Sequence, residues 1–126
     1  MTRTSSVPTE AELAILRVLW AGGPQTVRDI HQVLGASTSY TTTLKLLQNM
    51  TAKSLVERDT RERQHTYTAG VEQDATLVAV AARVVRRLFN GSRTDLMLRA
   101  LGDGTVTRNE ISELRRLLRL KEKELE

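Results

Sequence analysis

The side chains best suited to specific recognition lie in the stretch from Thr38 to Ala69. Thr41, Lys45, Gln48 and Asn49 recur at i, i+4, i+7 and i+8, the spacing of one helix face, and they offer hydroxyl, ammonium and amide groups. The edges of DNA bases display donors, acceptors and thymine methyl groups, and side chains of these types can bind each of them. The spacing therefore predicts a helix that reads bases in the major groove.

A group of cations follows this polar face. Lys53, Arg58, Arg61 and Arg63 lie at or beyond the end of the predicted helix. Lysine and arginine bind phosphates, which give affinity without sequence information. The alternative interpretation is that the polar helix face is merely solvated and that the charged segment is only a soluble turn.

Capping and periodicity indicate the elements that carry these groups. Ser39 is a good N-cap, and the buried face of the helix that follows is predicted to contain Thr43, Leu46, Leu47 and Met50. After this helix the period changes to two, which predicts strands over residues 55–58 and 64–68 joined by a charged turn over 59–63. A helix followed by a hairpin with a basic tip is the order of a winged helix.

Two helices are predicted upstream, after a polar lead over residues 1–8. Thr9 and Glu12 fit a capping box that begins a helix over residues 10–21, whose buried face is supplied by Leu13, Leu16, Val18, Leu19 and Trp20. Thr26 caps a second helix, which Gly35 can end and whose apolar residues are Val27, Ile30, Val33 and Leu34. The second and third helices form the predicted helix-turn-helix element.

The second part of the chain is predicted to form three amphipathic helices, over residues 72–89, over 94–101 and from Thr107 onward, where Thr107 and Glu110 repeat the capping box. Arg83, Arg86 and Arg87 are expected towards the solvated side of the first of these helices or towards its end. A unit of under about 60 residues buries too little apolar surface alone, so we expect a second copy to cover it. The alternative is that these helices fold back on their own chain. The residues predicted to form the dimer interface are Leu77, Ala81, Val84, Val85, Leu88, Leu98, Ile111, Leu114, Leu117 and Leu118.

The expected fold class is mainly α with a small β-hairpin. A winged helix-turn-helix DNA-binding domain over residues 1–70 would be followed by a three-helix dimerisation region over residues 71–126, with a hinge at Gly70. The formal net charge of +4 permits an anionic partner without requiring one.

Composition and motifs exclude several other functions. The 126 residues include no Cys, so disulfides and Cys-ligated metals are excluded. His31 and His65 lie in different predicted elements and make a poor metal site, and no GxSxG, HExxH, P-loop or GxGxxG motif is present. We therefore expect no enzymatic activity, no metal and no cofactor. The sequence has no apolar run of about 18 residues and no signal peptide, which predicts a cytoplasmic protein without direct membrane insertion.

Four segments resemble the penicillinase repressor family of winged-helix regulators (BlaI/MecI/CopY): AELAILRVLW from Ala11, GPQTVRDIHQVL from Gly23, YTTTLKLLQNM from Tyr40, and the RxRxHxY pattern from Arg61 to Tyr67. The resemblance implies a homodimeric repressor on an operator with two-fold symmetry. Matched by position, it implies DNA contacts at Ser39, Tyr40, Thr41, Thr42, Lys45 and Asn49.

The sequence departs from the family in two places that concern release from DNA. Copper-responsive members carry a cysteine cluster that is absent here, so copper sensing by that route is excluded. For β-lactam-responsive members the resemblance implies a membrane sensor protease as partner, with cleavage of an Asn-Phe bond. Arg99 and Ala100 occupy the matching positions, which puts cleavage at that bond in doubt, although the surrounding helix could be cut elsewhere.

Two other functional classes stay open at the level of sequence. A non-catalytic winged-helix module that docks proteins would show little DNA binding even at about 50 mM salt, where phosphate contacts are strong. A small-ligand sensor that also binds DNA would need a polar cluster for its ligand, and the sequence alone indicates none.

Overall fold

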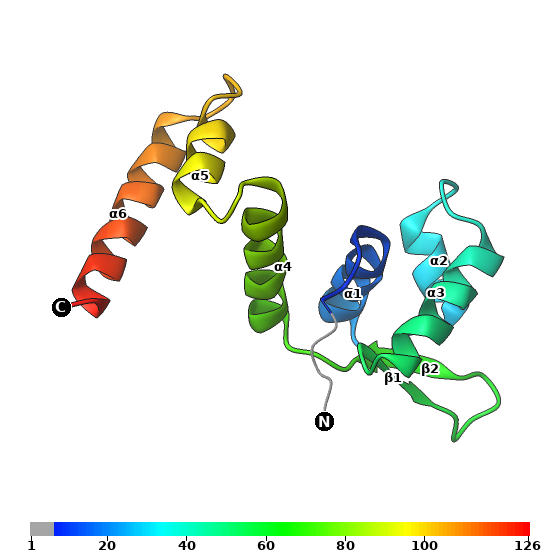
Figure 1. Cartoon of the computed structure of the whole chain (residues 1–126). Coiled ribbons are helices and arrows are strands. Elements are labelled where there is room, and N and C mark those ends of the chain that lie inside the picture. Colours follow the sequence, from blue (N-terminus) through cyan, green and yellow to red (C-terminus); the bar gives the residue numbers. More distant parts are fainter. Residues whose placement is uncertain (1–6) are drawn as a thin grey trace. The chain divides into compact units, whose positions relative to one another are not determined.

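The computed structural model describes residues 7–126 and divides the chain into two compact units, the first ending at Arg83 and the second running from Val84 to Glu126. Residues 1–6 of the predicted polar lead lie outside the described part. The first unit contains α1 (Glu10–Gly22), α2 (Val27–Leu34), α3 (Tyr40–Ala52), β1 (Val56–Asp59) and β2 (Thr66–Ala69) (Figure 1). Helix α4 (Gln73–Leu88) begins in the first unit and ends in the second. The second unit also contains α5 (Arg93–Leu101) and α6 (Arg108–Glu124). This mainly helical fold with one small hairpin confirms the predicted class.

The helices begin where side-chain oxygens satisfy the first amides of each helix. The Thr9 Oγ1 atom accepts a hydrogen bond from the Glu12 amide at 3.2 Å, and Glu12 accepts one from the Thr9 amide at 3.0 Å. Thr26 and Thr107 form the same reciprocal capping box at α2 and α6. Ser39 caps α3, as predicted, by accepting a hydrogen bond from the Thr42 amide.

The core of the first unit joins α1, α2 and α3 to the hairpin. Its buried members are Ile15, Leu16, Leu19, Val27, Ile30, Leu47, Met50, Leu55, Val56 and Tyr67. The predicted buried face of α1 overlooked Ile15, which is fully buried, and Val33 of α2 is 65% exposed. Leu13, Val18 and Trp20 are only half-buried.

The hairpin pairs β1 with β2 in antiparallel register, with Arg58 opposite Tyr67. Both strands begin and end later in the chain than the sequence predicted. The Leu55 amide, at the predicted start of the first strand, instead donates to the Met50 carbonyl of α3 at 2.9 Å. The loop before α2 adds a short bridge, in which the Gln25 amide donates to the Tyr67 carbonyl at 3.1 Å and the Tyr67 amide donates to the Gln25 carbonyl at 2.8 Å. The hairpin is thereby fixed to the start of the helix-turn-helix element.

Helix α4 and the segment before it are hydrogen-bonded to the rest of the first unit. Arg83 Nη1 donates to the Val7 carbonyl at 3.1 Å and Nη2 donates to the Pro8 carbonyl at 2.6 Å. Trp20 Nε1 donates to the Val71 carbonyl at 3.1 Å. Arg83 is therefore half-buried and bonded, and the prediction that it lies on the solvated side was wrong.

Gly70, the predicted hinge, lies between β2 and α4, and the structure gives a steric reason for a glycine at this position. A Cβ atom added to Gly70 would lie 2.9 Å from the Ser54 carbonyl oxygen. The Gly70 amide also donates to the Leu55 carbonyl at 2.8 Å. Gly70 thus permits a close approach of two backbone segments.

In the second unit, the helices bury almost none of their apolar side chains. Neither α5 nor α6 contains a buried residue. Among the described hydrophobic residues from Val84 onward, only Val85 is buried. An α5 cap is nevertheless well formed, since Ser92 Oγ accepts a hydrogen bond from the Asp95 amide at 3.0 Å.

Candidate nucleic-acid interface

Helix α3 separates its polar and apolar residues onto different faces. Thr43, Leu47 and Met50 are fully buried. The exposed residues of the same helix include Thr41, Thr42, Lys45, Gln48 and Asn49. The side chains predicted to read bases are therefore accessible together, and the buried Thr43 hydroxyl is satisfied by the Ser39 carbonyl at 3.2 Å.

The first turn of α3 is rigidly held. Ser39 Oγ accepts a hydrogen bond from the Thr42 amide at 3.1 Å and donates one to Thr42 Oγ1 at 2.9 Å. The Tyr40 ring packs edge-on against His31 of α2, with ring centroids 5.9 Å apart and an interplanar angle of 83°. His31 Nδ1 is buried and has no hydrogen-bond partner among the described residues. These contacts orient the start of α3 relative to α2.

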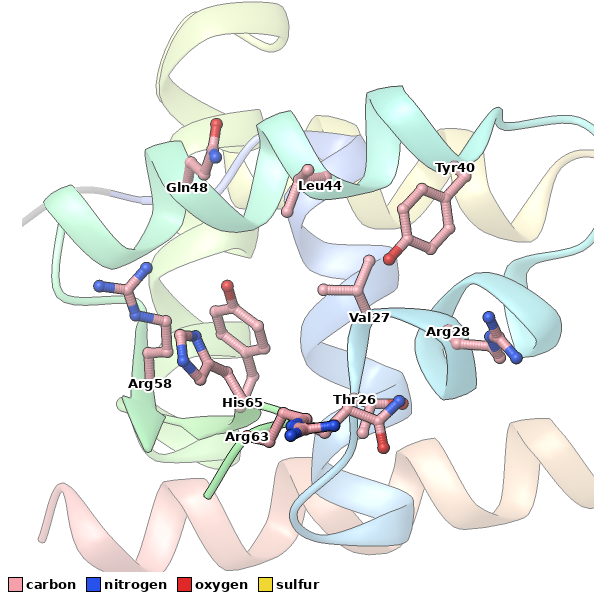
Figure 2. A pocket seen from close by; sticks show the side chains of 11 residues that line it. Thr26, Val27, Arg28, Tyr40, Leu44, Gln48, Arg58, Arg63 and His65 are labelled. Atoms are coloured by element: carbon pink, nitrogen blue, oxygen red, sulfur yellow. The ribbon is translucent and has the colours of Figure 1, made fainter. Parts of the chain in front are cut away.

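A groove of about 270 Å³ lies between α2, α3 and the hairpin (Figure 2). Tyr40, Leu44 and Gln48 line it from α3, and Val27 and Tyr67 contribute apolar surface. The remaining lining residues are polar or cationic: Thr26, Arg28, Arg58, Arg63, Gln64 and His65. None of the described residues that line the groove carries a carboxylate.

The wing cations differ in their partners. Within residues 7–126, Arg58 and Arg63 form no ion pair with a carboxylate. Arg61 instead binds Asp59, with Nη2 to Oδ2 at 2.6 Å and Nε to Oδ1 at 3.0 Å. The hydrogen bonds from the Arg61 side chain and amide lower the pKa of Asp59 to about 2, so that carboxylate stays charged and opposes the Arg61 charge.

Lys53 has a structural partner. Its Nζ atom lies 2.7 Å from Glu12 Oε2, and the Glu12 side chain is only 3% exposed. Burial acts to raise the pKa of Glu12, but hydrogen bonds from Lys53 and from the Thr9 amide outweigh it and leave that pKa below its usual value. The ion pair joins the end of α3 to the start of α1, and Lys53 does not line the groove.

Residues 8–120 match the sequence profile of the penicillinase repressor family. The chain belongs to this family. The match confirms the resemblance seen in the sequence, and membership of the penicillinase repressor family makes the chain a DNA-binding transcriptional regulator. None of the curated proteins matches the chain in sequence.

Solved structures of similar fold include a repressor domain and a protein complexed with operator DNA. The DNA-binding domain of the repressor BlaI is 19% identical, with 56% of this chain and 90% of that chain covered and a TM-score of 0.49. A mutant MarR from E. coli complexed with operator DNA is 19% identical, with 89% of this chain and 74% of that chain covered and a TM-score of 0.51. At these identities the similarity concerns the fold.

The penicillinase repressor motifs of this chain include Arg28 and His65, but they do not indicate that these residues share a groove. Arg28 and His65 line it and were not predicted as DNA contacts. The available signal was weak, because Arg28 is one exposed cation on α2. Only the packing of α2 on α3 and the Gln25–Tyr67 bridge to the hairpin bring it to the groove that Arg58 and Arg63 also line.

The residues predicted for the dimer interface have mixed accessibility within one chain. Val85 is buried, and the half-buried residues are Leu77, Val84, Ile111 and Leu114. The exposed ones are Ala81, Leu88, Leu98, Leu117 and Leu118. None of the helices in the described part of the chain is long and apolar enough to cross a membrane.

Proposed function

We propose that this member of the penicillinase repressor family is a homodimeric, cytoplasmic repressor that binds an inverted-repeat operator. The observation that carries the proposal is the division of α3, in which Thr43, Leu47 and Met50 are buried while Lys45 and its polar neighbours are exposed. An exposed polar helix face beside a basic hairpin fits a major groove and its adjacent backbone.

Roles within this interface follow from residue chemistry. Thr41, Lys45, Gln48 and Asn49 would contact base edges, and the first turn, with Ser39, Tyr40 and Thr42, would approach the DNA at the start of the helix. Arg58, Arg61 and Arg63 would bind phosphates. Lys53 is assigned a different task, that of fixing the end of α3 through its ion pair with Glu12.

The proposed homodimer rests on the apolar surface of the second unit. Leu88 is 74% exposed, and Leu98 and Leu118 are each 65% exposed. Leaving so much apolar surface in water costs about 25 cal/mol per Å², which a second copy would recover. A dimer would also present two α3 helices to successive major-groove faces about 34–36 Å apart.

Selection of DNA sequences from a random pool by the purified protein tests the proposal, with the mass of the complex and its salt dependence measured alongside. We expect recovery of a short inverted repeat bound by two subunits. A folded dimer that enriches no sequence at about 50 mM salt would contradict the proposal and favour a protein-docking module.

A further inference from the structure

We propose that the groove between α2, α3 and the hairpin binds a segment of the DNA backbone, with Arg28 and His65 as phosphate contacts beside Arg58 and Arg63. This inference rests on the proposed function and extends it to two residues that lie in the family segments but were not predicted to contact DNA. It also assigns a task to α2, which otherwise only supports α3.

The charge of the groove is the first argument. Arg28 comes from α2, Arg58 from β1 and Arg63 from the turn of the hairpin, so three arginines from separate segments line one groove, with Arg28 and Arg58 at its opposite ends (Figure 2). Within residues 7–126 none of the three forms an ion pair, in contrast to Arg61 on the same hairpin. Cations gathered without counter-charges repel one another, and a bound anion relieves that repulsion. The planar guanidinium group matches the oxygens of a phosphate.

The first turn of α2 adds backbone donors to the groove. Thr26, Val27 and Arg28 line it, and the amides of Val27 and Arg28 have no acceptor among the described residues. The positive end of a helix favours a phosphate. Asp29 is engaged in the capping box through the Thr26 amide at 3.2 Å and lies outside the lining. In this proposal the arginines supply the positive charge, and the amides at the start of α2 orient the bound phosphate.

The position of the groove beside α3 indicates which anion it binds. Tyr40, Leu44 and Gln48 line it at i, i+4 and i+8, which makes them one flank of the helix. Thr41, Lys45 and Asn49 form the adjacent row, one residue further along, and we assign this row to bases together with Gln48, which lies at the border of the groove. When that row enters the major groove, a backbone strand that borders the groove must pass along the flank. In Figure 2 the Tyr40 side chain extends from α3 toward Val27.

The apolar side chains in the groove favour a backbone segment over an isolated ion. Val27, Leu44 and Tyr67 form an uncharged part of the lining, in which Leu44 is half-buried and the other two are buried. Deoxyribose can pack against Leu44 while its phosphate contacts the surrounding arginines. A free phosphate would leave that surface unused. We therefore assign the site to the phosphodiester of bound DNA.

The test combines protein variants with neutral DNA linkages. Arg28→Gln and His65→Gln change exposed side chains, and Arg17→Gln is the matched control because Arg17 is an exposed arginine of α1 outside the groove. We expect Arg28→Gln to weaken binding to the selected operator and to random DNA by a similar factor of about ten, and to reduce the slope of log K against log salt by about one. We expect Arg17→Gln to change both measurements little.

Replacing single operator phosphates by methylphosphonates then locates the contact. For each variant, Arg28→Gln and His65→Gln, we expect one position at which the neutral linkage weakens wild-type binding but weakens the variant much less, because the contact is already lost. Absence of any such coupled position would overturn the inference, as would an equal effect of Arg17→Gln. Binding of inorganic phosphate in the groove, seen by NMR without a coupled operator position, would also overturn it.

The two proposals fail in different ways. If wild-type protein binds neither the selected pool nor random DNA at about 50 mM salt, the proposed function fails. If a wild-type dimer binds its operator while Arg28→Gln and His65→Gln keep the wild-type affinity and salt slope, the operator function stands and the groove inference alone is wrong.

Discussion

Lys45 and Lys53 lie near each other in sequence but in different surroundings. Lys45 is exposed on α3 and forms no ion pair within residues 7–126. Lys53 neutralises the buried Glu12 carboxylate. Removing either lysine deletes one charge near the proposed interface, yet the expected consequences are distinct.

Replacing Lys45 by alanine is expected to weaken operator binding by about 1–3 kcal/mol and binding to random DNA much less, because the proposed contact is to a base. Titration of both DNAs at one salt concentration measures this difference. An equal loss on both would make Lys45 a phosphate contact and remove it from sequence recognition.

Replacing Lys53 by methionine is expected to lower the free energy of unfolding at pH 7 by about 1–3 kcal/mol, because Glu12 would keep a buried charge without its cation. The pKa of Glu12 is lowered in the folded protein, so the stability from this pair is present above the ordinary value of 4.5 and is lost as the pH falls below it. The difference between wild type and variant should therefore narrow in acid.

Denaturant unfolding of both proteins at pH 7 and at low pH checks this expectation. The double variant Glu12→Gln, Lys53→Met is the control, since it removes both charges and should lose less of its stability at pH 7 than Lys53→Met. A stability gap independent of pH would show that Lys53 contributes through packing alone.

Sequence patterns revealed the exposed residues of α3 because they depend on helical spacing, which is local. Pairing between distant residues could not be predicted in the same way. Lys53 and Glu12 are 41 residues apart, and Arg83 binds carbonyls 75 and 76 residues before it. For the same reason Arg28 looked like any surface cation until α2 packed beside the hairpin.

At the scale of elements, helix starts were the most predictable feature. Thr9, Thr26, Ser39 and Thr107 all cap helices as expected, because a cap involves only the next few residues. Strand limits and buried faces were less predictable, since they depend on which neighbour covers each side. Val33 repeats the apolar spacing of α2, but no described element buries it.

Replacing Ser39 by alanine is expected to cost about 1 kcal/mol of stability, because the amide of Thr42 would lose its acceptor. Asparagine at the same position can accept that hydrogen bond and should restore most of the stability. Thermal or denaturant unfolding of the three proteins measures the effect of the cap.

Operator titration with the same three proteins separates capping from DNA contact. If Ser39→Asn recovers stability but not affinity, the hydroxyl contacts DNA as well as the helix. Recovery of both would limit Ser39 to its role as a cap. A fully stable Ser39→Ala variant would show that α3 is held by packing without this hydrogen bond.

At the scale of the whole molecule, burial is distributed unevenly. The first unit contains the joined core of α1, α2, α3 and the hairpin, whereas α5 and α6 bury no residue within one chain. The sequence predicted this imbalance from the length and pattern of the second part. The geometry of a dimer depends on a second chain, which periodicity within one chain does not describe.

Replacing Leu118 by aspartate is expected to raise the dissociation constant of the dimer by at least about tenfold, or about 1.4 kcal/mol, because a charge would enter the proposed interface. Sedimentation measurements across a concentration series check this. Since Leu118 is 65% exposed in one chain, helix content should not change. Arg115→Asp on the same helix is the control, and an unchanged dimer in Leu118→Asp would remove this part of α6 from the interface.

The hydrogen bond from Trp20 to the Val71 carbonyl has a practical consequence. Trp20 is the single tryptophan of the chain, and its indole is half-buried where α1 meets the segment leading into α4. Its fluorescence therefore comes from one known place. A shift of its emission on adding operator or an inducer would report a rearrangement at the start of α4 without any attached dye, and the same signal would follow unfolding of the first unit.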